Sequence, residues 1–353
     1  MPIDSAPLLG TALHAIGASS AALCYAPQRY LHKWSWQTYW LLQAAGCWFV
    51  LPWIFAWATI PELGAVLAEA PKDAMLKSYA LGTLYGIGGI AFGVAIRYIG
   101  FSLTYALAIS ISCVLGTLLP PAIAGTLGET LASSAGLIVI GGVLLGGGAM
   151  FVTGYAGFRR EREVAADTAT APFNARVGLP IVILAGVLSA VFNFSLQAAA
   201  PVAAVAAKHG AGHFQGNVIY LFSNSGAFTT TVIYAGWLAF RARSWGEYVR
   251  TADGIGLARN YALAMLTGLL WYLQFFFYGL GHVRMGRFEF SSWAIHMIIL
   301  ILLSCGFGVV VGEWKKCRPG TRRLLSCSIA LLLGAVGLIT YGNYLASPTP
   351  AVH

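Results

Sequence analysis

The chain has 353 residues, of which 58% are hydrophobic and only 9% are charged, and its formal net charge is +9 at pH 7. A soluble domain would carry about 25% charged residues, so this composition excludes a soluble globular fold and indicates a protein embedded in a lipid bilayer. The positive charge does not indicate nucleic-acid binding, because that requires a soluble basic surface with exposed aromatic side chains.

Ten apolar segments of roughly 19–27 residues follow one another along the chain, and each is about long enough to cross a bilayer as a helix. We therefore predict an all-α polytopic membrane protein with ten transmembrane helices. In chain order, the predicted spans are residues 8–26, 38–60, 78–96, 101–119, 135–157, 177–200, 214–240, 260–281, 288–311 and 322–345.

Basic residues separate the predicted loops into two sets. The loops after odd-numbered spans contain 16 of the 21 Lys and Arg residues, the loops after even-numbered spans contain five, and the two tails contain none. Basic loops stay in the cytoplasm, so the odd loops are predicted to be cytoplasmic. Both termini are then expected outside the cytoplasm.

Missing motifs exclude several chemistries. The chain has no G-x-x-x-x-G-K-[ST] phosphate-binding loop, so ATP is not the expected energy source. All four aspartates lie in loops or in the N-terminal tail, which argues against an intramembrane aspartyl protease. The six cysteines are scattered without metal-ligand spacing, so the sequence predicts no metal, disulfide or cofactor.

The polar stretch 158–176 divides the ten spans into two halves of five. An odd number of spans per half requires the halves to insert with opposite orientations, which is the inverted-repeat plan of many secondary transporters. We therefore predict a first five-helix repeat at 1–157, a cytoplasmic linker at 158–176 and a second repeat at 177–353. Weak similarity supports this plan: with a shift of 186 positions, Gly82 and Tyr85 fall on Gly268 and Trp271.

The eighth predicted span carries an aromatic and polar stripe. Trp271, Gln274, Tyr278 and His282 recur at helical spacing on one face. A Trp and a Tyr on either side of an amide can hold a sugar, because the ring stacks on its C–H face and the amide pairs with its hydroxyls. The stripe is equally typical of aromatic helix packing that ends at the membrane interface.

The ninth span begins with Glu289, Trp293 and His296 at i, i+4 and i+7, which predicts one stripe. Imidazole titrates nearest neutral pH, and a desolvated carboxyl can be neutral there. Glu289 is our first choice for a proton carrier, as a buried carboxyl, followed by His296; His14 in the first span and His282 are the other candidates. Each histidine can instead be a neutral hydrogen-bonding group between helices.

Four further polar residues are candidates for contact with a substrate. Tyr25 and Gln28 lie at the end of the first span, and Asn193 and Gln197 lie at i and i+4 in the sixth. Polar groups in hydrocarbon are costly, so they are expected to face the interior of the bundle.

Several runs are similar to one known family. The runs are HAIGASSAALCYAP (14–27), KWSW (33–36), IRYIG (96–100), WYLQFFFYGLGH (271–282) and SWAIHM (292–297). Together they resemble the L-rhamnose–proton symporter family of the drug/metabolite transporter superfamily, in order and over essentially the whole chain.

The resemblance implies a bacterial inner-membrane importer of a deoxyhexose, most closely L-rhamnose, that is driven by protons and is not an enzyme. Its partners would be a small-molecule sugar, protons and the bilayer, and both termini would be periplasmic. The positions that match the family are His14, Trp271, Gln274, Tyr278, His282, Trp293 and His296. The chain departs from the family at Phe288-Glu289-Phe290, where Y-D-Y is expected, at Ala200, where a basic residue is expected, and at Gly89, where an amide is expected.

Three alternatives remain open at this point. The first is a transporter of another sugar or metabolite on the same scaffold. If it is an exporter of metabolites or drugs, its cavity would be less polar than Asn193, Gln197 and Gln274 indicate. An intramembrane enzyme acting on a lipid-linked sugar would need an acid–base pair, for which only Glu289 and His282 qualify. A passive channel would need a selectivity filter, and no segment resembles one. The sequence does not predict an oligomeric state.

Overall fold

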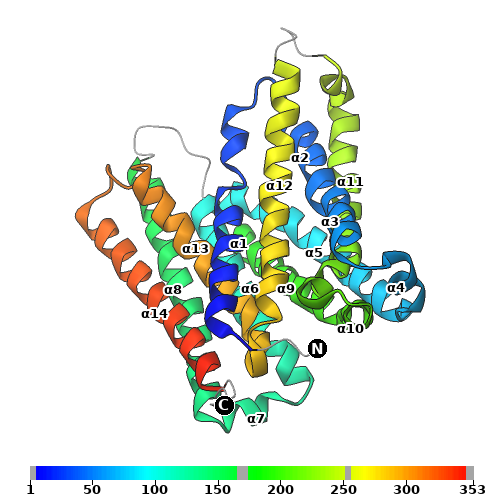
Figure 1. Cartoon of the computed structure of the whole chain (residues 1–353). Helices are drawn as coiled ribbons and strands as arrows, with labels where there is room; N and C mark the ends of the chain where they lie inside the picture. The colour runs from blue at the N-terminus through cyan, green and yellow to red at the C-terminus, as the bar shows by residue number, and fades with distance from the viewer. Residues whose placement is uncertain (1–4, 165–173, 251–255, 347–353) are drawn as a thin grey trace. The chain divides into compact units, whose positions relative to one another are not determined.

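A computed structural model describes residues 5–164, 174–250 and 256–346, and within these ranges the chain is helical without any β-strand (Figure 1). Nine helices in these ranges are long and apolar enough to cross a membrane. They are Pro7–Gln28, Trp36–Thr59, Lys72–Ile99, Ser102–Ile123, Ser134–Val164, Ala175–Lys208, Gly256–His282, Gly286–Val310 and Pro319–Ala346.

The seventh predicted span is the one missing from this set. Helix α11 (Tyr220–Ala242) occupies its place and has 23 residues. Ser223, Asn224 and the run Thr229-Thr230-Thr231 lower its hydropathy, and therefore it does not qualify on composition. The ten predicted segments are all helical, and nine of them are both long enough and apolar enough to cross a membrane.

The full set of helices alternates long spans with short turns; η marks short 3₁₀ or π segments. The bounds are α1 (Pro7–Leu23), η1 (Ala26–Tyr30), α2 (Trp36–Ala45), η2 (Gly46–Val50), α3 (Leu51–Thr59), α4 (Leu63–Glu69), α5 (Lys72–Ile99), α6 (Phe101–Ile123), α7 (Leu127–Leu131), α8 (Ser134–Val164), α9 (Ala175–Ala198), α10 (Ala200–Lys208), η4 (Gly212–Val218), α11 (Tyr220–Ala242), η5 (Ser244–Tyr248), α12 (Gly256–His282), η6 (Gly286–Ser291), α13 (Ser292–Val310) and α14 (Pro319–Ala346).

The chain divides into two compact units, and each contains residues from both halves of the sequence. The first unit contains Ser20–Ile87 and Phe194–Gly279. The second unit contains Pro2–Ser19, Gly88–Asn193 and Leu280–His353. Helices α1, α5, α9 and α12 contribute residues to both units.

Pro52 explains why the second span is not a regular α-helix. Proline has no backbone N–H, so the carbonyl of Trp48, four residues earlier, loses its helical partner. The backbone responds with a π-helical turn over Gly46–Val50, in which the N–H of Leu51 donates to the oxygen of Gly46. Such turns are frequent at functional sites, and this one changes the direction in which Trp48 points.

Two glycine crossings bring the helices of the first unit close together. A Cβ at Gly268 of α12 would lie 2.8 Å from the oxygen of Gln43, and its nearest neighbours include Gly46. A Cβ at Gly226 of α11 would collide with the oxygen of Tyr79 and the backbone of Gly82 on α5. Only glycine permits these approaches, as is typical of membrane helix interfaces.

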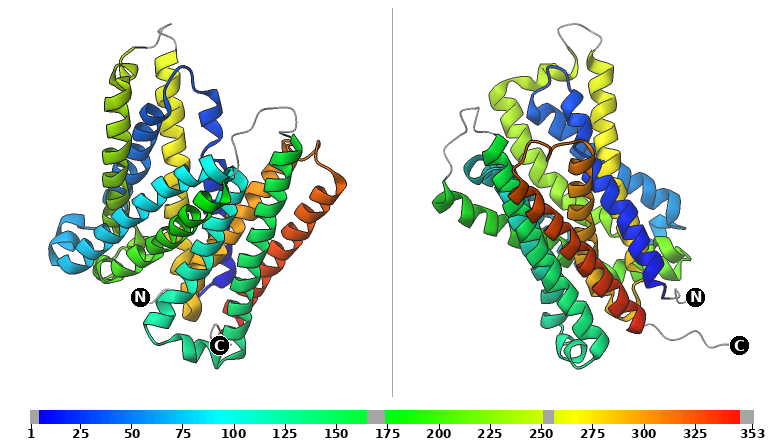
Figure 2. Two further views of the ribbon diagram at one scale, coloured as in Figure 1. Left: turned by 180° about the vertical axis from the view of Figure 1, so that it is seen from behind. Right: turned by 90° about the vertical axis from the view of Figure 1, so that its left-hand side faces the viewer.

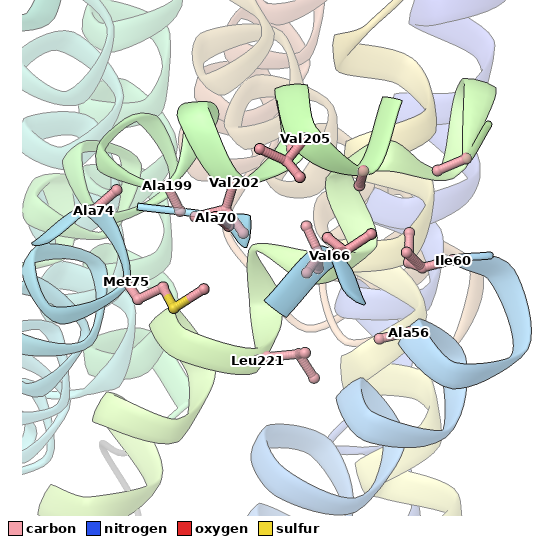
Figure 3. Close-up of a cluster of buried hydrophobic side chains, with 14 residues drawn as sticks. Ala56, Ile60, Val66, Ala70, Ala74, Met75, Ala199, Val202, Val205 and Leu221 are labelled. Atoms are coloured by element: carbon pink, nitrogen blue, oxygen red, sulfur yellow. The ribbon is translucent and has the colours of Figure 1, made fainter. Parts of the chain in front are cut away.

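A buried apolar cluster consolidates one end of the first unit (Figure 3). Ala56, Ile60 and Val66 come from α3, α4 and the turn between them, and Val202 and Val205 come from α10. Small side chains dominate this cluster, so the short helices α4 and α10 pack closely with the ends of the longer ones.

Helices α8 and α14 lie side by side in the second unit (Figure 2). A Cβ at Gly142 would lie 2.7 Å from Cγ1 of Ile339, and one at Gly342 would lie 2.6 Å from Cγ2 of Val139. The glycine-rich fifth span is therefore a packing surface, since its glycines lie where a neighbouring helix approaches.

The predicted linker 158–176 begins as helix, because α8 continues to Val164; residues 165–173 lie outside the described residues. Glu163 near the end of α8 accepts hydrogen bonds from Oγ1 of Thr321, at 2.6 Å, and from the backbone N–H of Arg318, at 2.8 Å. These bonds attach the end of α8 to the start of α14.

Candidate functional site

Three aromatic side chains meet around Trp271 in the first unit. The Trp271 ring centroid lies 5.3 Å from that of Tyr25, 5.6 Å from that of Trp40 and 5.1 Å from that of Trp48, each in an edge-on arrangement. We call Tyr25, Trp40, Trp48 and Trp271 the aromatic cluster. Edge-on rings with centroids 4.5–7 Å apart are a favourable geometry, so the four rings hold one another in place.

The local backbone explains how these rings converge. Trp40 lies on α2 and Trp48 lies eight residues later, in the π-helical turn that Pro52 causes. The crossing at Gly46 and Gly268 brings that segment against α12 one turn before Trp271. Trp48 and Trp271 are both less than a tenth exposed, whereas Tyr25 is 37% exposed.

The polar stripe predicted for the eighth span lies on one continuous helix, α12. Gln274 and Tyr278 are buried, like Trp271. Of the two other predicted ligands in this unit, Gln28 follows Tyr25 in η1 and donates its backbone N–H to the oxygen of Tyr25, at 3.2 Å. Gln197 is exposed on α9.

Asn193 and Trp293, the remaining predicted substrate ligands, belong to the second unit. The amide of Asn193 donates to the oxygen of Gly116, at 2.7 Å, and the indole N–H of Trp293 donates to the oxygen of Ser112, at 3.0 Å. Both donors therefore bind the backbone of α6. In this arrangement they join α9 and α13 to α6, and their role in binding stays a prediction.

The second unit also brings together three predicted proton carriers. The ring centroids of His14 on α1 and His296 on α13 are 5.8 Å apart, and both residues are at most 2% exposed. A Cβ at Gly281 would lie 3.0 Å from Nε2 of His14, so α12 also passes close to this imidazole. His282 lies next to Gly281, and its Nδ1 is 3.0 Å from Oγ of Ser292.

The predicted stripe through Glu289, Trp293 and His296 was wrong at its first residue. Helix α13 starts at Ser292, and Glu289 lies before it in the 3₁₀ segment η6. Gly286, at φ +67°, and Phe288, at φ −108° and ψ 40°, interrupt helical geometry there. Glu289 is also exposed instead of buried, so the desolvation argument for this carboxyl no longer applies.

Sequence reasoning missed Trp40 and Trp48, although a signal was present. Trp36, Trp40 and Trp48 recur at spacings of four and eight, which is one face of a helix. Such a stripe in an apolar span reads as lipid-facing or packing aromatics, because nothing local indicates that the rings of a distant helix will meet it.

Comparison with known proteins shows the family of the chain. The family of the L-rhamnose-proton symport protein matches residues 3–345. The chain belongs to this family. The match includes every element of both units, from α1 to α13 and nearly all of α14, so the aromatic cluster and the histidines are parts of one symport-family protein.

Relatives in the symport family cover nearly the whole chain. The L-rhamnose-proton symporter of Mannheimia succiniciproducens is 31% identical over 342 residues, which are 95% of this chain and 98% of the relative. That of Pectobacterium carotovorum subsp. carotovorum is 30% identical over 344 residues, 93% of this chain and 96% of the relative. No solved structure matches the chain.

Proposed function

We propose that this protein is a proton-coupled symporter that imports L-rhamnose across the bacterial inner membrane, and that it transports its substrate without chemical conversion. Family membership over residues 3–345 carries this proposal, together with relatives that bear the name L-rhamnose-proton symporter. The buried aromatic cluster fits the sugar, because aromatic rings can cover the apolar C–H faces and the methyl group of a deoxyhexose.

The proposal includes ten membrane-spanning helices, with α11 as the seventh, in two inverted repeats of five that meet at the linker 158–176. The paired glycine crossings of the first unit support it. Gly46 and Gly226 are 180 positions apart, and Gly82 and Gly268 are 186 apart. The second span crosses the eighth at Gly46 and Gly268, and the seventh crosses the third at Gly226 and Gly82. An inverted duplication predicts this exchange of partners.

Trp271, Gln274 and Tyr278, with Tyr25, form the centre of the proposed sugar site. Trp271 and Tyr25 are in ring contact, and Gln274 and Tyr278 follow Trp271 along one helix. Four predicted ligands have a secondary role in this proposal: Gln28, Asn193, Gln197 and Trp293. The side chains of Asn193 and Trp293 donate to backbone oxygens of α6, Gln197 is exposed, and the backbone N–H of Gln28 donates to the oxygen of Tyr25.

His14 and His296 are the proposed proton carriers. They replace Glu289 as first choice because the two rings adjoin one another in a buried position, whereas Glu289 is exposed. An imidazole can bind and release a proton, and two neighbouring imidazoles resist double protonation. Such a pair would hold a single proton, which is what a carrier of one coupling ion requires. His282, beside Gly281, is the third candidate.

The test is uptake of radiolabelled L-rhamnose into proteoliposomes that contain the purified full-length protein. An imposed pH gradient, acidic outside, is expected to drive accumulation above equilibrium, and a protonophore is expected to reduce it to equilibration. Competition with other neutral sugars defines the substrate. Accumulation that is independent of the pH gradient would contradict proton coupling, and uptake that excess L-rhamnose does not reduce would contradict the substrate.

A further inference from the structure

Four buried side chains in the first unit carry polar atoms without a hydrogen-bond partner among the residues that the structure describes. One is Asn224 of α11, and the other three lie in the second span and in α12. The unpaired atoms of these three are Nε2 and Oε1 of Gln43, Nε1 of Trp48 and the hydroxyl of Tyr272. Gln43 and Tyr272 are 0% exposed and Trp48 is 5% exposed. Buried polar groups in native proteins are almost always paired, so four such atoms in one region require an explanation.

All three residues lie where the second span faces α12. The backbone oxygen of Gln43 adjoins Gly268, and the ring of Trp48 lies 5.1 Å from that of Trp271. Tyr272, the next residue on α12, has its ring 4.9 Å from that of Phe55 on α3. The unpaired atoms therefore belong to residues of one interface, beside the aromatic cluster.

This interface is polar but uncharged. Neither the span Trp36–Thr59 nor residues 260–281 of α12 contain Asp, Glu, Lys or Arg. A charged ligand would be buried there without a counter-charge, at a high desolvation cost. A neutral ligand rich in hydroxyl groups would not incur that cost.

The available donors and acceptors match such a ligand. A primary amide offers two donors and a carbonyl oxygen, an indole offers one donor, and a phenol offers one donor and acceptor sites. Gln43 can thus pair with two neighbouring hydroxyls of a pyranose, and Trp48 and Tyr272 can each bind one more. The rings of Trp48 and Trp271 would cover its apolar face.

We infer that Gln43, Trp48 and Tyr272 form a hydroxyl-binding subsite for the transported monosaccharide and determine which hydroxyls it must have. This inference rests on the proposed function and adds three residues to the proposed site. A sugar can reach these atoms only if α12 separates from the second span. Alternating access requires such movements between helices, and this one would separate Trp271 from Trp40 and Trp48.

Three substitutions test the subsite by removing its polar atoms: Gln43→Leu and Tyr272→Phe, which nearly keep the shape of the side chain, and Trp48→Phe, which leaves a smaller ring. Binding is measured on the purified full-length protein in detergent by isothermal titration with a panel of neutral monosaccharides that includes L-rhamnose. We expect each variant to bind the preferred sugar about tenfold more weakly or worse, because hydroxyls lose a buried partner. The thermal midpoint of Gln43→Leu and of Tyr272→Phe should stay unchanged or rise, because an unpaired buried polar atom destabilises the unliganded fold.

Tyr39→Phe is the matched control. Tyr39 is another fully buried tyrosine of the first unit, but its hydroxyl donates to Oγ1 of Thr267, at 2.6 Å. Tyr39→Phe should lower the thermal midpoint and leave the affinity for the preferred sugar within about twofold of the wild-type value. Deoxy analogues of the preferred sugar sharpen the test: the loss caused by Gln43→Leu should vanish for an analogue that lacks the hydroxyl bound by Gln43.

The outcomes separate this inference from the proposed function. Wild-type binding of L-rhamnose with unchanged affinity in all three variants would overturn the subsite and leave the symporter proposal standing. Binding of a different neutral sugar that weakens in the variants would uphold the subsite and overturn L-rhamnose as the substrate. Absence of wild-type binding to every sugar of the panel would overturn both.

Discussion

The imidazole rings of His14 and His296 lie 5.8 Å apart at an angle of 72°, although 282 positions separate them in the sequence. One belongs to the first span and the other to the ninth, and both are buried within the second unit. Two neighbouring imidazoles that hold one proton between them are a simple device by which a membrane helix bundle can bind and release that proton.

Substitution of either histidine by glutamine should separate transport from its driving force. We expect His14→Gln and His296→Gln to keep sugar exchange between equal concentrations and to lose accumulation driven by a pH gradient, because glutamine can hydrogen-bond but cannot carry a proton. Exchange and accumulation are measured in the same proteoliposomes. The exposed His213 provides the control, since His213→Gln should preserve both activities. Normal accumulation in both buried variants would remove the pair from the coupling mechanism.

Removal of the Trp271 ring should weaken sugar binding strongly. Trp271→Ala deletes the residue that contacts the three other rings of the aromatic cluster, and a stacked aromatic pair alone contributes about 0.5–1.5 kcal/mol beyond its buried area. We expect at least a tenfold loss of affinity in equilibrium binding. Trp237→Ala, at a half-exposed tryptophan of α11, should change affinity little. Equal losses in the two variants would show that the effect is not specific to the cluster.

The glycine crossing between the second span and α12 should not tolerate a methyl group. Gly268→Ala would place Cβ 2.8 Å from the oxygen of Gln43, and overpacking of this kind typically costs about 1–3 kcal/mol. Gly89→Ala on α5 meets no atom within 4 Å and should be neutral or stabilising by up to about 1 kcal/mol. Thermal unfolding in detergent compares the two variants. If the close approach at Gly268 stabilises the fold, only Gly268→Ala should lower the thermal midpoint.

A histidine between two carboxylates should make the stability of the first unit depend on pH. Nε2 of His209 lies 2.9 Å from Glu69 and Nδ1 lies 3.2 Å from Glu62. These hydrogen bonds raise the pKa of His209 above its ordinary value of 6.5. A raised pKa in the folded state means that protonation favours folding, so the contribution is complete below pH 6.5 and is lost as the pH rises through the raised value.

The thermal midpoints of wild type and His209→Gln, measured across this pH range, test that sign. The difference should be largest on the acidic side and should shrink as the pH rises above 6.5. His213→Gln, four residues further on and exposed, should show no comparable trend. A difference that grows with pH would contradict the assignment.

The asymmetry of basic residues predicts that both termini are periplasmic. Sixteen of the 21 Lys and Arg residues fall in loops after odd-numbered spans. Alkaline phosphatase, which is active only outside the cytoplasm, should therefore be active when fused to the C-terminus, and green fluorescent protein fused there by the same route should not fluoresce. The reverse pattern would invert the proposed topology.

The helical class of the chain and the approximate places of its apolar segments could be read from the sequence, because burial in lipid is decided locally, by the hydropathy of some twenty consecutive residues. Nine of the ten predicted spans qualify as membrane-spanning helices among the described residues. The stripe of Trp271, Gln274 and Tyr278 could be read in the same way, since one helix determines its own spacing. The family resemblance was also available from short runs, and the match over residues 3–345 confirms it.

Contacts between distant spans were decided only by the tertiary structure. The ring of Trp48 meets Trp271 because Pro52 forces a π-helical turn and because Gly46 and Gly268 let two helices approach. Glu289 does not lie on the helix of Trp293 and His296, because Gly286 and Phe288 interrupt helical geometry before Ser292. The hydropathy of a segment predicts that its side chains are buried but not which side chains they contact. Contacts between residues more than 200 positions apart depend on how the helices pack.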